Sequence, residues 1–129
     1  MTVAFLSPEW LDEQGRLGAA LPERPGASAR IQVVVTGTPN GDVAYVQTIE
    51  DGRLVAAQPM RDDSADVTLT NTYADAVEIA TGNLDPSVAY MQGRTKVVGD
   101  VGRLMAVMPL LQSDEHRALL GELAAATDL

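Results

Sequence analysis

The spacing of apolar residues changes from a period of two to a period near 3.6 partway along this chain of 129 residues. From Arg30 to Thr36, apolar residues alternate with polar ones, which predicts a half-buried strand. After Thr72 the apolar residues return every three or four positions, which predicts amphipathic helices. Because strands and helices occupy separate stretches and each must bury its apolar side, the chain is expected to be an α+β protein.

The first half of the chain predicts one helix followed by strands. Ser7 and Pro8 are the cap and first-turn residues typical of a helix start. Asp51 and Gly52 form a dipeptide that favours a tight hairpin between two strands. Four strands are expected here, over residues 30–36, 43–49, 53–58 and 66–70.

The second half predicts helices around one further strand. Each helix is expected to begin at a short polar side chain that can accept a backbone hydrogen bond, and these are Thr72, Asp85, Asp100 and Ser113. A fifth strand is expected over residues 94–98, with Thr95 and Val97 on the same face. Pro109 is expected to end or kink the helix that begins after Gly99. The result is a twisted sheet covered on one face by helices.

Composition excludes several classes of protein. Eighteen acidic and nine basic residues give a formal net charge of −9, and no basic patch stands out, so nucleic-acid binding lacks its usual electrostatic attraction. The chain has no cysteine, which rules out disulfides and thiolate metal sites. The length fits one domain over residues 1–129.

Membrane and export signals are not expected in this sequence. The longest apolar run, residues 104–111, is too short to span a bilayer and contains Pro109. The opening residues lack the basic and apolar segments of a secretory signal. Together with the absence of cysteine, this favours a cytoplasmic location.

The polar residues offer little catalytic chemistry. His116 is the only histidine, so neither a catalytic triad nor a site with paired histidines can be built within one chain. It is expected to be solvated in a helix's first turn beside Asp114 and Glu115. The carboxylates at 62–66 are expected to form a solvated loop rather than a calcium site. No catalytic residue, metal or cofactor is therefore assigned.

The stretch 85–100 carries the most specific pattern. Tyr90-Met91-Gln92-Gly93 is followed by Arg94-Thr95-Lys96-Val97 and then by Val98-Gly99-Asp100. This resembles the sterol carrier protein 2 family, in which aromatic-aromatic-Gln-Gly precedes Lys-apolar-Lys-apolar, a free position and Gly-Asn. The resemblance covers about residues 30–125 and identifies a stand-alone member of bacterial type. It implies a five-stranded, mostly antiparallel sheet whose helices enclose an apolar tunnel.

The resemblance also implies a function and a set of contacts. The function is non-catalytic binding and transfer of a fatty acid, fatty acyl-CoA, sterol or similar lipid, with transient membrane contact. Gln92 is expected to orient the polar end of the ligand. The other expected ligand contacts are Trp10, Val77, Leu84, Val88, Tyr90, Met91, Val101, Leu104, Met105 and Met108. Met91 replaces an aromatic residue of the family and Thr95 an aliphatic one, which allows a more polar guest than a sterol.

Two alternatives stay open. The first is an enzyme, or a subunit of one, that folds a long apolar metabolite in the same tunnel for rearrangement or cyclisation. The second is a module without a pocket, in which Met105, Met108 and Leu111 pack against another subunit. The sequence does not set the oligomeric state.

Overall fold

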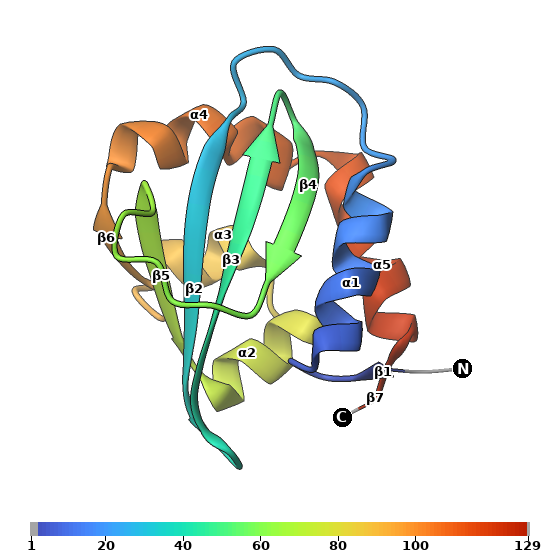
Figure 1. The fold of residues 1–129 in the computed structure, drawn as a ribbon, viewed down its shortest axis with the longest axis vertical. Helices are drawn as coiled ribbons and strands as arrows, with labels where there is room; N and C mark the ends of the chain where they lie inside the picture. Colours follow the sequence, from blue (N-terminus) through green and yellow to red (C-terminus); the bar gives the residue numbers. More distant parts are fainter. Residues whose placement is uncertain (1–2, 129) are drawn as a thin grey trace.

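The computed structural model describes residues 3–128 of the chain. Figure 1 shows a main sheet with helices packed against it. In chain order the elements are β1 (Val3–Ala4), α1 (Pro8–Gly18), β2 (Ala29–Thr38), β3 (Gly41–Glu50), β4 (Arg53–Gln58), β5 (Val67–Thr72), α2 (Tyr73–Ala80), α3 (Pro86–Met91), β6 (Lys96–Gly99), α4 (Val101–Leu111), α5 (Asp114–Ala125) and β7 (Thr127–Asp128).

Five strands form the main sheet in the order β4-β3-β2-β5-β6. Neighbours run antiparallel except β2 and β5, which run parallel with Ile31 opposite Val67. The chain reaches this parallel pairing only after the hairpins of β3 and β4 and the connection that follows them. The expected α+β class, with a five-stranded and mostly antiparallel sheet, is confirmed.

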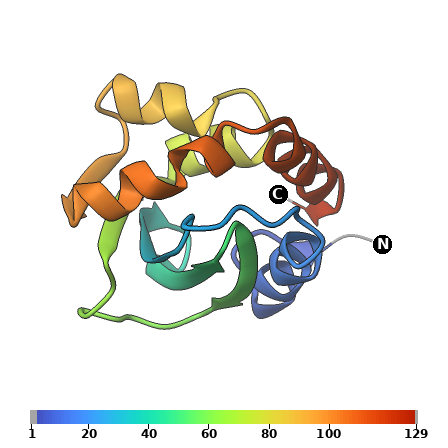
Figure 2. The ribbon, with the colours of Figure 1, turned by 90° about the horizontal axis from the view of Figure 1, so that it is seen from above.

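Helices α2 to α5 lie on one side of the main sheet, and α1 lies beside its β4 edge, as Figure 2 shows. The residues of β2 that face them are nearly inaccessible, with Ile31 and Val35 each 1% exposed. On α4, Leu104, Val107 and Leu110 recur every three residues and are equally buried. The alternating apolar residues of β2 and the helically spaced apolar residues of α4 therefore pack together in one core.

The five helices found within residues 3–128 begin where the sequence predicts. Each N-cap side chain accepts a hydrogen bond from a backbone N–H two or three residues ahead, which satisfies a donor that has no partner within the helix. The caps are Ser7, Thr72, Asp85, Asp100 and Ser113.

Pro109 does not end its helix, contrary to one of the two expected outcomes. The helix α4 continues to Leu111, and the Gln112 N–H donates to the carbonyl oxygen of Met108. Pro109 itself is exposed, so the Met105 carbonyl that loses its helical donor is on a side open to water. Leu110 is 1% exposed, and its burial favours continuing the helix past the proline.

A second, smaller sheet was not expected. The strands β1 and β7 pair in parallel, with Val3 opposite Thr127. Each strand has two residues, too few for a periodic pattern. The pairing holds the segment before α1 against the end of α5, and this segment contributes to the site described next.

Candidate functional site

An apolar cavity of about 170 Å³ lies between the covered face of the sheet and the helices. A single water molecule needs roughly 10–15 Å³ of such space, so the cavity can hold a segment of several heavy atoms. Its floor comes from alternate residues of the strands, including Ile31, Val33 and Val35 of β2. The same period of two that buries these side chains aims them at the cavity.

Helices α4 and α5 cover the cavity on the side opposite the sheet. Leu104, Met108 and Leu111 of α4 line it at spacings of three and four residues, as do Leu119 and Leu123 of α5. These side chains occupy one stripe of each helix. The cavity is thus enclosed mainly by aliphatic groups, which interact with a guest through apolar area and shape rather than charge.

The segment before and inside α1 supplies an aromatic wall. Phe5 and Trp10 both line the cavity and meet edge to face, with ring centroids 5.1 Å apart. Trp10 meets Tyr45 of β3 in the same way at 5.7 Å. The indole N–H donates to the Thr127 hydroxyl at 3.1 Å, so the ring has a fixed orientation.

The structure brings four of the predicted ligand contacts to the cavity. Trp10, Tyr90, Leu104 and Met108 line it. Val77 is half-buried and Leu84 is buried, but neither lines the cavity. The other five are exposed and outside it: Val88, Met91, Gln92, Val101 and Met105.

Gln92 is the C-cap residue of α3, and its backbone N–H donates to the Val88 carbonyl. Its side-chain oxygen lies 3.5 Å from an Arg94 nitrogen, at the outer limit of a hydrogen bond. The ligand roles of Gln92 and of the other residues outside the cavity stay predictions.

Sequence reasoning missed most of the cavity floor and the contribution of α5. Residues such as Val33 and Leu123 belong to apolar patterns, and such a pattern is the same whether the side chains fill a close-packed core or line a cavity. The signal available was that α5 and β2 both present apolar stripes toward the same side. That signal locates the layer but not the empty space within it.

Two hydrogen-bonded pairs of polar side chains line the cavity. Gln47 on β3 donates through its side-chain nitrogen to the side-chain oxygen of Gln14 on α1, at 3.1 Å. The Thr95 hydroxyl donates to the side-chain oxygen of Asn71 at 2.6 Å. Thr95 therefore faces inward, as predicted.

His116 is not the solvated residue that the sequence predicts. It is half-buried and lines the cavity between α3 and α5. Burial lowers the pKa of its imidazole from the ordinary value of 6.5, and the nearby Leu111 carbonyl and the Asp85 charge oppose this shift. The polar residues next to His116 in the sequence suggest an exposed position, but they lie on other sides of the helix.

Stability is expected to depend on the protonation of His116. Its folded pKa is lower than its unfolded pKa, so its contribution is full above about pH 6.5 and is lost as the pH falls through the folded value. His116→Asn should remove this dependence. The measurement is urea unfolding of both proteins between about pH 5 and pH 7.5. A constant difference in unfolding free energy across that range would contradict the prediction.

The acidic cluster near residue 62 has structural partners. The Asp62 carboxylate lies 2.6 Å from the Arg30 guanidinium and accepts hydrogen bonds from Ser64. The Ser64 hydrogen bonds, with the Arg30 charge, hold the pKa of Asp62 below its ordinary value. Within residues 3–128, no three His, Asp or Glu side chains are grouped to hold a metal ion. No helix among them is long and apolar enough to cross a membrane.

Fold and cavity define an α+β chain whose five-stranded sheet and helices enclose apolar space. A model of the SCP-2 sterol transfer family matches residues 12–112, and the chain belongs to this family. It is 30% identical to sterol carrier protein 2 of Rattus norvegicus over 85 residues. That match covers 65% of this chain and 15% of the rat protein, so the chain corresponds to a small part of this relative.

Solved structures show the same fold. A conserved protein of Thermus thermophilus matches with a TM-score of 0.75 at 20% identity, over 95% of this chain and 92% of that one. Palmitated SCP2L2 of Aedes aegypti matches with a TM-score of 0.63 at 22% identity, over 83% of this chain and 96% of that one. The expected family and fold are thus confirmed.

Proposed function

We propose that residues 1–129 act as one domain that binds a lipid in the cavity and carries it between sites in the cytoplasm, without changing it chemically. The observation that carries this proposal is the apolar cavity itself, whose walls come from all layers of the fold. The guest is a fatty acyl chain or a compact sterol-like ring system, taken up and released during transient contact with membranes.

Two further observations support the proposal. The chain belongs to a sterol transfer family, and the related Aedes aegypti protein was solved in palmitated form. The energetics also fit, because each buried methylene contributes roughly 0.8 kcal/mol. About ten buried methylenes give roughly 8 kcal/mol before the costs of association, and the part that remains after those costs sets the affinity. Nothing in the described cavity favours the enzyme alternative.

Trp10 provides a direct test, because it is the only tryptophan of the chain and lines the cavity. We expect its fluorescence to change saturably on titration with saturated fatty acids. The affinity should rise about fourfold for each added methylene, the equivalent of 0.8 kcal/mol, until the cavity is full. The chain length at which the rise stops then measures the cavity.

Butyrate serves as the control, because a chain this short buries too little area to bind. Cholesterol is the second probe, for a ring-shaped guest. The proposal fails if neither palmitate nor cholesterol alters Trp10 fluorescence and native mass spectrometry also finds no co-purified lipid.

A further inference from the structure

Most polar side chains in the cavity wall already have a partner there. Gln14 and Gln47 bond to each other, as do Asn71 and Thr95. The indole N–H of Trp10 points away to Thr127. A ligand that bonded to these atoms would have to replace interactions that the protein already makes, with little net gain.

The hydroxyls of Tyr45 and Tyr90, which also line the cavity, make no hydrogen bond to another described residue. Two further polar atoms of the wall are fully buried. The Ser87 hydroxyl oxygen and the His116 Nδ1 are buried. The Ser87 hydroxyl has no hydrogen-bond partner among the described residues, and the Leu111 carbonyl near the His116 ring makes no hydrogen bond of ordinary geometry to Nδ1. Both residues line the cavity. Since buried polar groups in proteins are nearly always hydrogen-bonded, this pair of unpaired atoms needs a partner.

Ser87 and His116 lie at the same end of the cavity, because α3 and α5 begin side by side. Asp85 caps α3 by accepting a hydrogen bond from the Ser87 N–H at 2.8 Å. The same carboxylate lies 3.7 Å from the guanidinium of Arg117, the residue after His116. Its charge also acts on the His116 ring. Asp85 therefore ties the two helix starts together around one polar spot in an apolar wall.

We propose that Ser87 and His116 bind the polar end of the ligand, and that this end is an uncharged hydroxyl or carbonyl oxygen. The inference rests on the proposed function, since it needs an apolar chain in the cavity. It places the head group between the first turns of α3 and α5, away from Gln92, which lies at the other end of α3.

The charges around the spot disfavour an anionic head group. The carboxylate of Asp85 acts on the spot, and the neighbouring Arg117 is already paired with it, at 3.7 Å. Burial keeps the His116 ring neutral near neutral pH by lowering its pKa, so the ring offers no positive charge to a carboxylate. An ion taken into an apolar cavity loses its hydration without recovering it, whereas a neutral oxygen needs only one or two hydrogen bonds.

The test compares three ligands with the same alkyl length: dodecane, 1-dodecanol and dodecanoate. Trp10 fluorescence gives the affinity of each. One net hydrogen bond should make dodecanol bind about fivefold to tenfold more tightly than dodecane. Dodecanoate should bind less tightly than dodecanol at neutral pH.

Ser87→Ala and His116→Phe separate this head-group contact from general packing. Each removes a hydrogen-bonding atom and keeps an apolar group of similar shape. In both variants the preference for dodecanol over dodecane should be lost. Because His116 is the only histidine, its imidazole nitrogen resonances are a second readout, and they should shift with dodecanol and not with dodecane.

The outcomes distinguish this inference from the proposed function. If dodecane and dodecanol bind equally to the unaltered protein, or the preference survives both substitutions, the head-group site is refuted and the cavity still binds lipid. Tighter binding of dodecanoate refutes the uncharged head group. If no probe binds, the proposed function itself fails. If His116→Phe does not fold, Ser87→Ala and the imidazole resonances decide.

A separate surface feature carries a second inference. Exposed large apolar side chains recur along α3, on the edge strand β6 and along the first half of α4; on β6 this is Val98, which points to the side opposite the inward-facing Val97. Figure 2 shows the end of α3, β6 and the start of α4 at one end of the molecule. Of the seven such side chains among residues 3–128, five lie between positions 88 and 105, and we call these five the α3–α4 face: Val88, Met91, Val98, Val101 and Met105. Met91 is 79% exposed and Val98 70%.

The charge of this segment is opposite to that of the rest of the chain. Residues 88–105 contain Arg94, Lys96 and Arg103 against Asp100, a net charge of +2, which leaves −11 for the remainder of a chain of −9. Arg94 pairs with Asp75 at 3.0 Å. Within the described part of the chain, Lys96 and Arg103 form no ion pair, so their charges are available to a partner.

We infer that the α3–α4 face docks on an anionic lipid bilayer. Exposed apolar side chains beside free cations are suited to the headgroup boundary, where area burial and attraction to anionic lipids add. The acidic remainder of the surface is repelled by the same bilayer, so the charge distribution orients the molecule with this face toward the lipid. Met105 and Val101 continue the stripe of Met108, so the docked face adjoins a helix that lines the cavity.

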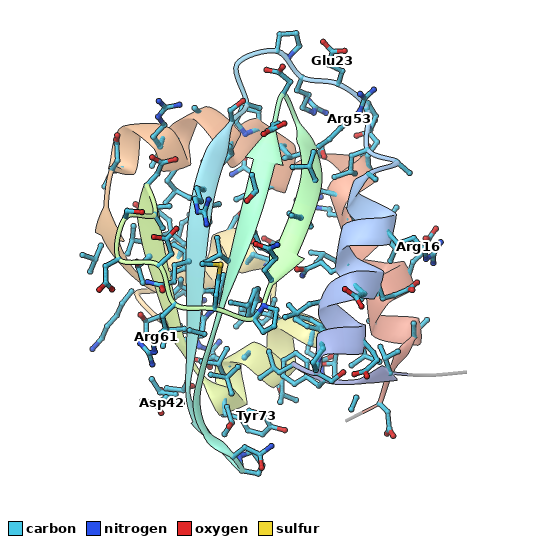
Figure 3. All side chains as sticks on the ribbon, in the orientation of Figure 1. Arg16, Glu23, Asp42, Arg53, Arg61 and Tyr73 are labelled. Atoms are coloured by element: carbon cyan, nitrogen blue, oxygen red, sulfur yellow. The ribbon has the colours of Figure 1, made fainter. Side chains whose placement is uncertain are left out.

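The test is co-sedimentation with vesicles of phosphatidylcholine, alone or with phosphatidylserine. Lys96→Glu with Arg103→Glu, and separately Met91→Asp with Val98→Asp, should each weaken binding to the anionic vesicles at least about tenfold. Val55→Asp and Met60→Asp are matched controls, being 48% and 37% exposed outside this face. Arg61→Glu controls for charge; Figure 3 shows Arg61 on the connection between β4 and β5.

Binding that ignores phosphatidylserine, or that the control variants weaken equally, refutes the docking face. A dimer in light scattering that the two face variants dissociate would assign the face to self-association instead. Dodecane uptake in the absence of vesicles should be unchanged in Lys96→Glu with Arg103→Glu, which separates docking from cavity binding.

Discussion

Met108→Trp is expected to weaken palmitate binding at least about tenfold, while Met105→Trp leaves it unchanged. Met108 lines the cavity, whereas Met105, nearly one turn away on α4, is 47% exposed and lies outside it. An indole in place of the Met108 thioether occupies space that ligand methylenes need, and displacing two of them costs about 1.6 kcal/mol, or more than tenfold in affinity.

Equilibrium dialysis with radiolabelled palmitate measures this effect without interference from the added tryptophan. Overpacking destabilises a core by about 1–3 kcal/mol, so urea unfolding must show that Met108→Trp remains folded. The pair also tests the contacts that the sequence predicts. If Met105→Trp were the variant that lost binding, the ligand would lie along the outer stripe of α4, where Val101 and Met105 are found.

Gly99→Ala is expected to destabilise the fold by more than about 2 kcal/mol, since it adds a clash to a strained backbone conformation. Gly99 has a φ of +120°, and a Cβ there would lie 2.6 Å from the Asp66 carbonyl oxygen and 3.0 Å from the Val67 Cα. Both atoms belong to the backbone of the neighbouring chain segment and cannot move aside cheaply. Val67 pairs with Gly99 in the sheet, so the clash falls on the pairing of β5 and β6.

Gly93→Ala is the matched control for this substitution. Gly93 also has a positive φ, +74°, but a Cβ there would meet no atom within 4 Å. It should cost roughly 1 kcal/mol, the penalty for a left-handed residue with a side chain. Urea unfolding of both variants measures the difference. Equal losses at the two positions would mean that strand β6 can move away from β5 without loss.

Local signals predicted the order of elements well. Ser7, Thr72, Asp85, Asp100 and Ser113 cap helices in the structure because a side-chain oxygen at that position replaces a missing backbone acceptor, a rule that needs no tertiary information. The strand alternation depends only on the direction of successive side chains. Pro109 shows the limit of these local signals. A proline inside a helix carries an energetic penalty, and the burial of Leu110 offsets it. The sequence alone shows the penalty but not the burial.

The cavity could be predicted only in part. On α4, Leu104 and Met105 are both apolar, and only packing of the whole helix decides that Leu104 is 2% exposed and Met105 47%. No local pattern distinguishes these two positions. His116 was misplaced for the same reason, since a histidine between an acidic residue and an arginine has the composition of a surface. Family resemblance gave the fold and the presence of apolar space, whereas helix rotation set which side chains reach that space.

The parallel pairing of β2 with β5 has a consequence for the order of folding. The hairpins of β2, β3 and β4 join strands that are neighbours in the chain. The pairing of Ile31 with Val67 instead joins residues that are far apart in sequence, and such long-range contacts slow folding. The helices that roof the cavity come after β5 in the chain, so we expect the cavity to be complete only late in folding. A bound lipid should therefore slow unfolding and leave the folding rate unchanged, an asymmetry that stopped-flow measurements can detect.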